Sequence, residues 1–158
     1  MSIYFRKWLI AFSLLSVMHT ALAATEAPQS LLVLGRSNVD DYSVPLDDQD
    51  WRWLRAKGTL LLGASAPDYA PFEITGSSDD YEGLTADYAQ LLGELLHVRV
   101  EVRRFASRAD VVEALKKGEV DLLGTANSFE IADPELAMSS AYAEDQPTLV
   151  TGLVTART

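Results

Sequence analysis

Apolar residues along the chain switch between the period of a strand and the period of a helix, and these switches predict the elements of one domain. The apolar run 59–63 predicts a buried strand. Over 84–97 the apolar positions recur every three or four residues, which predicts a helix with one buried face. Valines then alternate with charged residues over 98–103, which is the period of a strand that buries one face.

A second helix and further strands are predicted after this unit. The range 107–117 predicts a helix, because Ser107 has the S-x-x-D spacing of a cap and Gly118 follows the last basic residues. The apolar run 120–123 predicts a short buried strand. Three weaker assignments follow: a polar loop at 124–130, a short helical turn near 133–138 and a strand at 148–155. Strands that alternate with helices imply right-handed crossovers, so the expected fold class is α/β, a mainly parallel sheet with flanking helices.

The segment before the first of these strands divides into a leader and a short helix. Residues 24–46 contain many loop-forming residues and are predicted to be a leader or linker, with an edge strand at 31–34 as the alternative. Aspartates crowd the start of 48–57 and basic residues its end, as the helix dipole favours, so this range predicts a helix. Trp51 and Leu54 lie on one face of it, which predicts that they rest on the domain.

The first 23 residues have the three-part pattern of a secretory signal peptide. A basic pair precedes the eleven-residue, largely apolar stretch 8–18, and residues 21–23 have the small-x-small pattern of a cleavage site. The alternative is an uncleaved anchor, but this stretch is well below the ~20 residues that span a bilayer. We therefore expect export to the periplasm, cleavage after Ala23 and no stable membrane insertion afterwards.

Charge and composition exclude several classes of function. The net charge is −10, and residues 1–23 carry two of the thirteen basic residues and none of the 23 acidic ones, so the remaining 135 residues carry −12. This acidity argues against binding nucleic acid, which needs a basic face. The chain has no cysteine, and beyond the predicted signal its one histidine is His97, near a helix end. With no catalytic or phosphate-binding motif either, we expect no enzyme activity, no catalytic residue, no cofactor and no metal site.

Four sequence elements, in order and spacing, carry a resemblance to a known family. They are an aromatic loop that ends in Tyr69-Ala70-Pro71-Phe72, a G-[LF]-x-x-D element at 83–87, a helix-to-strand element at 115–123 and an S-x-x-Y element at 139–142. Over about 31–155 the chain resembles the extracellular solute-binding proteins of family 3. The amino-acid sequences of 51–54 and 83–88 are most similar to those of the periplasmic flytraps of BvgS-type hybrid sensor histidine kinases. The resemblance implies a periplasmic-binding-protein-like lobe that recognises a small polar solute of the amino acid or organic acid class, without catalysis.

The same resemblance implies a set of site residues. The ligand-binding candidates are Tyr69, Phe72, Thr125, Asn127, Ser128 and Tyr142. Packing of the aromatic loop and capping of turns are the alternatives for the first five, and Tyr142 either lines the hinge between lobes or packs. Structural roles are expected for Gly83, Asp87 and Asp121.

Two departures from the family pattern shape the functional hypotheses. Members that bind amino acids carry an arginine after the strand at 120–123, and residues 125–133 contain none. A complete flytrap also has a second lobe, so the domain at 47–158 is expected to be a truncated first lobe with little affinity by itself. The main hypothesis is a noncatalytic solute-binding or sensory module of a transporter or two-component sensor. The alternatives are a small exported interaction protein that docks on a sensor or on a separate lobe, and a remnant of a cyclohexadienyl dehydratase, an enzyme class with a similar fold.

Overall fold

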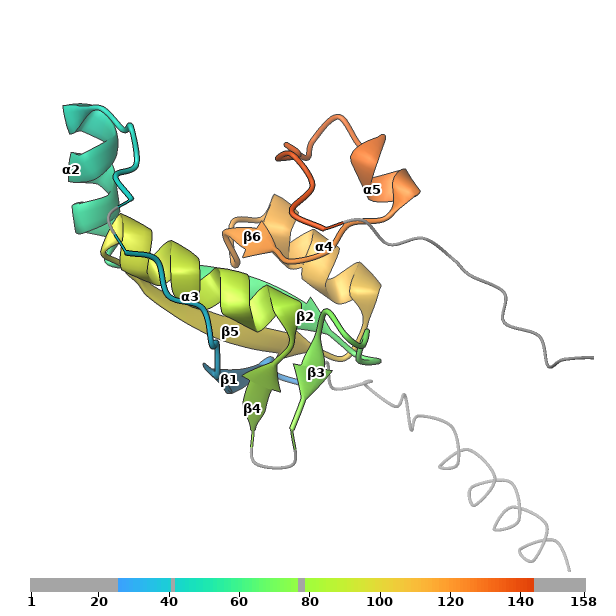
Figure 1. Ribbon diagram of the computed structural model, residues 1–158. Coiled ribbons are helices and arrows are strands. Elements are labelled where there is room, and N and C mark those ends of the chain that lie inside the picture. Colours follow the sequence, from blue (N-terminus) through green and yellow to red (C-terminus); the bar gives the residue numbers. More distant parts are fainter. Residues whose placement is uncertain (1–25, 41, 77–78, 144–158) are drawn as a thin grey trace, which may run out of the picture.

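A computed structural model describes residues 26–40, 42–76 and 79–143. In this part of the chain, helices flank one six-stranded sheet with the strand order β3-β4-β1-β5-β2-β6 (Figure 1). The strands are β1 (Gln29–Val33), β2 (Thr59–Ser65), β3 (Ile74–Thr75), β4 (Asp80–Glu82), β5 (Arg99–Phe105) and β6 (Leu122–Leu123). The helices are α2 (Asp48–Lys57), α3 (Leu84–Leu96), α4 (Arg108–Lys116) and α5 (Ser128–Ile131). The predicted signal peptide at 1–23 and the predicted strand at 148–155 lie outside the described residues.

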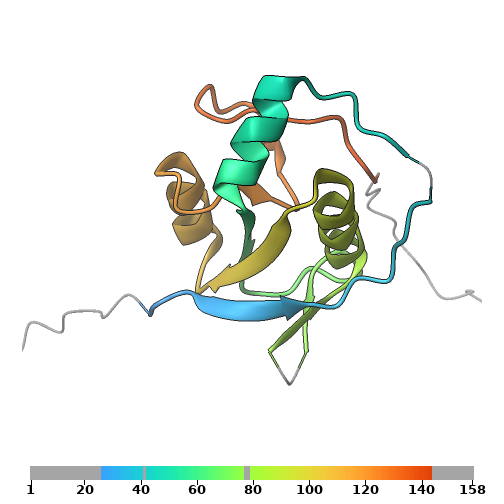
Figure 2. The same ribbon diagram turned by 90° about the vertical axis from the view of Figure 1, so that its left-hand side faces the viewer.

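The predicted α/β unit is confirmed in β2, α3, β5, α4 and β6. Strand β2 pairs in parallel with β5 on one side and with β6 on the other. The side chain of Leu62 packs with Ala86 of α3, whereas a Cβ on the neighbouring Gly63 would meet Val111 of α4. Successive residues of a strand face opposite sides of the sheet, so α3 and α4 cover opposite faces, as Figure 2 shows. The chain thus passes from β5 on one side of β2 to β6 on the other.

Helix α2 has the caps and the buried face that the sequence predicts. The Asp47 side chain accepts hydrogen bonds from the amides of Gln49 and Asp50, and Gly58 ends the helix in a left-handed conformation. Leu54 is buried and contributes to a small cluster at the start of β2, with Trp51 packed beside it. Trp53 stays 56% exposed. The helix therefore docks on the domain through the face that its periodicity indicates.

The leader contributes a strand to the sheet, which is a correction to its prediction as a linker or an edge strand. Strand β1 is antiparallel to β5 and parallel to β4, so it lies inside the sheet rather than at its edge. Leu31 turns inward and is 6% exposed, whereas its neighbour Leu32 is 64% exposed. Because β1 runs opposite to β5, the sheet is mixed, although the pairs around β2 are parallel.

Three local assignments differ from the prediction. The loop after β2 contains the hairpin of β3 and β4, which the sequence pattern did not indicate. Residues 128–131, predicted as loop, form α5, because the Asn127 and Glu130 side chains make a reciprocal capping box. The helical turn expected near 133–138 is a single hydrogen-bonded turn from Asp133 to Leu136. Within the described residues, no helix is long and apolar enough to cross a bilayer.

Candidate functional site

The candidate site lies where the carboxyl ends of three parallel strands meet. The order of strands reverses at β2, since β5 and β6 lie on its two sides. Open α/β sheets form a crevice at such a reversal, at the carboxyl ends of the strands. Here the loop after β2 brings residues 66–73, β5 leads to the start of α4, and β6 leads to Gly124 and Thr125. Segments that are far apart in sequence therefore meet at one end of the sheet.

A cavity of about 700 Å³ opens beside these strand ends. Four of the six predicted ligand-binding residues line it, namely Tyr69, Phe72, Thr125 and Tyr142. The other two do not. Asn127 is the N-cap of α5 and its side chain accepts hydrogen bonds from the amides of Phe129 and Glu130, while Ser128 is the first residue of that helix. For Asn127 the structure thus shows the capping alternative.

The aromatic wall of the cavity is a pair of stacked rings. The Tyr69 and Phe72 ring centroids are 5.4 Å apart with an interplanar angle of 20°. The loop is closed by backbone hydrogen bonds from the Phe72 amide to the Tyr69 carbonyl and from the Tyr69 amide to the Glu73 carbonyl, both 2.8 Å. Tyr69 remains 47% exposed, so the pair presents aromatic surface to the cavity side and to solvent.

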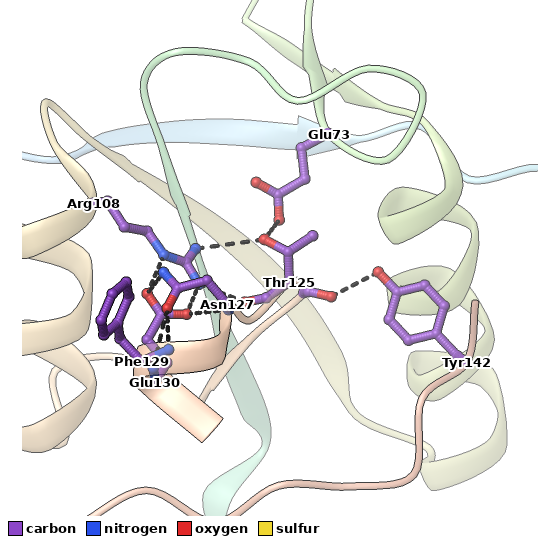
Figure 3. A network of polar contacts seen from close by, with 8 residues as sticks. Glu73, Arg108, Thr125, Asn127, Phe129, Glu130 and Tyr142 are labelled. Carbon is purple, nitrogen blue, oxygen red and sulfur yellow. Dashed lines mark hydrogen bonds and ion pairs between the residues drawn. The ribbon is translucent and has the colours of Figure 1, made fainter. Parts of the chain in front are cut away.

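Thr125 is the centre of a polar network behind the aromatic wall (Figure 3). Its hydroxyl donates to the Glu73 carboxylate at 3.2 Å, and its carbonyl accepts a 2.5 Å hydrogen bond from Arg108 Nη2. Thr125 thereby links the loop after β2 to the start of α4. The network holds the Thr125 backbone in place beside the cavity that Thr125 lines.

The sequence analysis missed Arg108, which supplies the guanidinium of this site. Its Nε and Nη2 atoms donate to the two oxygens of the Glu130 carboxylate at 2.7 and 2.6 Å, a bidentate pair. Glu130 also accepts from the Asn127 amide and side chain. The family pattern places its arginine within 125–133, whereas Arg108 comes from the first turn of α4. Its position directly after the Ser107 cap, at the end of β5, is the signal in the sequence that could have placed it at the site.

The two glutamates of the network have opposite pKa shifts. Burial raises the pKa of Glu73, and the Thr125 hydroxyl and the Arg108 charge only partly oppose this effect. The hydrogen bonds from Arg108 lower the pKa of Glu130 despite its burial. The same contacts raise the pKa of Arg108. A proton is therefore held most easily at Glu73, while Arg108 and Glu130 form a charged pair.

Tyr142 connects the segment after α5 to the rest of the lobe through hydrogen bonds and an aromatic contact. Its hydroxyl donates to the Gly124 carbonyl at 2.6 Å, so the Thr85 hydroxyl, 2.9 Å away, donates to it. The Tyr142 and Tyr88 ring centroids are 4.4 Å apart. The side chain thus packs against α3 and lines the cavity at the same time.

The three residues predicted to be structural each hold a backbone turn or strand. Gly83 has a φ of 104°, and a Cβ there would lie 2.6 Å from the Phe72 carbonyl oxygen. The Asp87 carboxylate accepts a 2.7 Å hydrogen bond from the Arg36 amide. Asp121 accepts from the Leu61 amide at 2.9 Å and pairs with Lys57 at 2.6 Å. Asp121 also lines the cavity, whereas Gly83 and Asp87 do not.

The groups at the cavity can bind a small molecule. They include aromatic rings, aliphatic side chains, hydroxyls and four charged side chains that are each paired within the protein. In the described segments there is no cluster of three or more side chains that would hold a metal ion. The arrangement can orient a small molecule by stacking and by neutral hydrogen bonds.

Comparison with known proteins identifies the family. The model of the bacterial extracellular solute-binding proteins, family 3, matches residues 61–151, which is more than half of the chain. The virulence sensor protein BvgS of Bordetella bronchiseptica is 42% identical over 141 residues, which cover 89% of this chain and 11% of BvgS. BvgS of Bordetella parapertussis is 43% identical over 130 residues, which cover 82% of this chain and 10% of that protein. The chain thus spans only about a tenth of the length of these relatives.

A solved structure agrees with the sequence matches. The crystal structure of the Bordetella pertussis BvgS periplasmic domain superposes with a TM-score of 0.56 at 42% identity, covering 60% of this chain and 18% of that chain. At this similarity the fold is shared. The chain therefore belongs to the bacterial extracellular solute-binding proteins of family 3, and its described residues form a periplasmic-binding-protein lobe similar to part of the BvgS periplasmic domain.

Proposed function

We propose that this chain is a noncatalytic periplasmic recognition module of a sensor or uptake system, and that it binds a small polar solute in the cavity beside β2 and β6. The observation that carries the proposal is the convergence of Tyr69, Phe72, Thr125 and Tyr142 on that one cavity of about 700 Å³. These residues come from three separate parts of the chain, and the switch point of the sheet is where such folds bind ligands. The match to BvgS, a sensor protein, favours the sensor over the transporter.

The proposal includes export by the predicted signal peptide and a second wall for the site. In a two-lobed flytrap the ligand stabilises the closed state because it contacts both lobes. One lobe supplies part of those contacts, so we expect an affinity in roughly the millimolar range for this chain alone. Mass determination of the exported protein would test cleavage after Ala23.

Ligand-observed NMR with a panel of uncharged, acidic and basic metabolites would test the site. Phe72→Ala removes one stacked ring of the cavity and should weaken the strongest binder about tenfold, since aromatic stacking contributes on the order of 1 kcal/mol. Phe129→Ala is the matched control, because Phe129 is 88% exposed and does not line the cavity. Equal binding by the wild type and Phe72→Ala would place the ligand elsewhere and overturn the proposal.

A second candidate function is that of a small exported interaction protein, which docks on a sensor or on a separate lobe. Phe129 and Ile131, on the one-turn helix α5, are 88% and 62% exposed, and such apolar exposure favours a partner surface. Under this alternative Phe129→Ala would abolish co-purification with a periplasmic or inner-membrane partner, and Phe72→Ala would not. The two variants therefore separate the two functions.

A further inference from the structure

Every charged side chain that lines the cavity already has an oppositely charged partner within the protein. The lining includes Lys116, Asp121, Glu130 and Glu135 as its charged residues. Lys116 Nζ lies 3.0 Å from a Glu135 carboxylate oxygen and 2.7 Å from Asp133. Asp121 is paired with Lys57 and Glu130 with Arg108. No cation of the described lining is left over for an anionic ligand, because Lys116 is shared by two carboxylates.

The Arg108 guanidinium is not available to a ligand in the cavity, because protein groups occupy both of its edges. A guanidinium offers two edges for bidentate contacts, and Glu130 occupies the Nε–Nη2 edge. The other edge faces Thr125, whose carbonyl accepts from Nη2 at 2.5 Å and whose hydroxyl lies 3.5 Å from Nη1. Thr125 and Glu130 line the cavity, but Arg108 itself does not. The two residues therefore stand between the guanidinium and any ligand.

The neighbouring acidic groups also disfavour the binding of a ligand carboxylate. Glu73 is buried behind Thr125, and Asp133 lies beside Lys116. Displacing Glu130 from Arg108 would leave a carboxylate that is 7% exposed without its cation, which is costly. A ligand carboxylate thus has no available cation and meets several carboxylates near the cavity.

We infer that the cavity excludes carboxylates and takes a polar solute that has a flat or aromatic face and no negative charge, and that the Arg108–Glu130 pair determines this exclusion. The inference rests on the proposed function and narrows its solute class, away from organic acids and amino acids held by a free guanidinium. Recognition falls to the Tyr69–Phe72 rings and to neutral groups such as the Thr125 hydroxyl.

Three probes of one shape and different charge test the inference: benzamide, benzoate and benzamidinium. Each is titrated into the wild-type chain at pH 7 and followed by ligand-observed NMR, with Phe72→Ala as the site control. We expect dissociation constants for benzamide and benzamidinium at least about tenfold below that of benzoate. We expect the benzamide-to-benzoate ratio to persist in about 0.5 M NaCl, where the general repulsion of an anion by an acidic protein is screened.

Two variants test the role of the pair. Glu130→Gln removes the carboxylate and frees the Arg108 charge, so it should shift the benzamide-to-benzoate preference toward benzoate by tenfold or more. The double variant Arg108→Gln/Glu130→Gln removes both charges and should keep the wild-type preference. Proton NMR dispersion confirms that each variant is folded, and the wild-type comparison stands even where a variant is not.

The outcomes separate the inference from the function on which it rests. A wild-type preference for benzoate over the other two probes that Phe72→Ala weakens would overturn the inference and leave the solute-binding function supported. An unchanged preference in folded Glu130→Gln would show that the pair is not the determinant. Binding of none of the three probes would contradict both the function at this cavity and the inference.

Discussion

Glu73 and Glu130 flank Thr125, and their different partners give them opposite electrostatic behaviour. Glu73 is 5% exposed, and the neutral hydroxyl of Thr125 donates a hydrogen bond to its carboxylate. Glu130 is also buried but receives two hydrogen bonds from a guanidinium. A carboxylate that loses water without gaining a cation binds its proton more tightly, and one that gains a cation binds it less tightly. The identity of the nearest donor therefore decides which of the two residues titrates first.

The stability of the protein relative to a Glu73→Gln variant should rise as the pH falls from 7 toward 4. Burial raises the pKa of Glu73 in the folded state above its ordinary value of 4.5, so the folded state takes up this proton before the unfolded state does. The contribution of Glu73 to stability is thus complete below pH 4.5 and is lost as the pH rises through the raised pKa. Urea unfolding of both proteins across this range measures the difference.

The stability of the protein relative to a Glu130→Gln variant should fall as the pH falls, and this opposite trend is a control for the Glu73 measurement. Hydrogen bonds from Arg108 lower the pKa of Glu130, so its carboxylate stabilises the fold above pH 4.5 and this contribution is lost as the pH falls through the lowered pKa. A wild type that loses stability relative to Glu73→Gln on acidification would contradict the proposed burial of Glu73.

The elements that the sequence predicts well are those whose signals are local. Helices α2 and α3 and strand β5 show their apolar period within a single segment, and the Asp47 capping box of α2 also lies within a few residues of the chain. The sequence predicts the residues of β1 as a linker, with an edge strand as the alternative, because the partners β4 and β5 lie some 50 to 70 residues further along the chain. A strand whose pairing is this remote leaves no periodic signal of the sheet in its own residues.

The residues of the candidate site show the same difference between local sequence signals and contacts that are remote in sequence. Tyr69, Phe72, Thr125 and Tyr142 were identified because motifs of the family mark them, and the structure places them together. Arg108 was missed because its contact with Glu130 depends on the sheet order, which brings the start of α4 beside the end of β6. Helix α5 was missed because one turn with a polar start has the composition of a loop.

The turns that end α2 and begin α3 differ in how strictly they require glycine. Gly58 and Gly83 both have a positive φ, of 68° and 104°, but a Cβ at Gly58 meets nothing within 4 Å. At Gly83 a Cβ would lie 2.6 to 2.7 Å from the carbonyl oxygens of Phe72 and Pro71. Gly58→Ala should therefore cost about 1 kcal/mol of backbone strain, and Gly83→Ala about 3 kcal/mol, because a backbone clash adds to the strain. Urea unfolding of the two variants tests this, and equal losses would contradict the close approach of the aromatic loop to α3.

At the scale of the whole molecule, the sheet is held together by a strand that precedes the predicted domain. The helix-linked core β2-α3-β5-α4-β6 accounts for one part of the sheet, and the hairpin of β3 and β4 accounts for another. Strand β1 joins the two parts, because it pairs with β4 on one side and β5 on the other. The hairpin in turn follows the aromatic loop of the cavity. The leader thus supports the candidate site without contributing a residue to its lining.

A variant that begins at residue 47 should therefore lose cooperative folding, whereas one that begins at residue 26 should keep it. The shorter variant lacks β1, so β4 and β5 lose their shared partner and the core cluster loses Leu31. Loss of one buried leucine side chain alone costs about 2–5 kcal/mol, a large share of the ~5–15 kcal/mol that stabilises a typical domain. Amide NMR dispersion and urea unfolding compare the two variants, with Leu31→Ala and the exposed Leu32→Ala as a milder matched pair. A strand inside the sheet cannot be removed without exposing the edges of both its neighbours. Equal unfolding midpoints for the two lengths would therefore show that the domain begins at residue 47 and that β1 is dispensable.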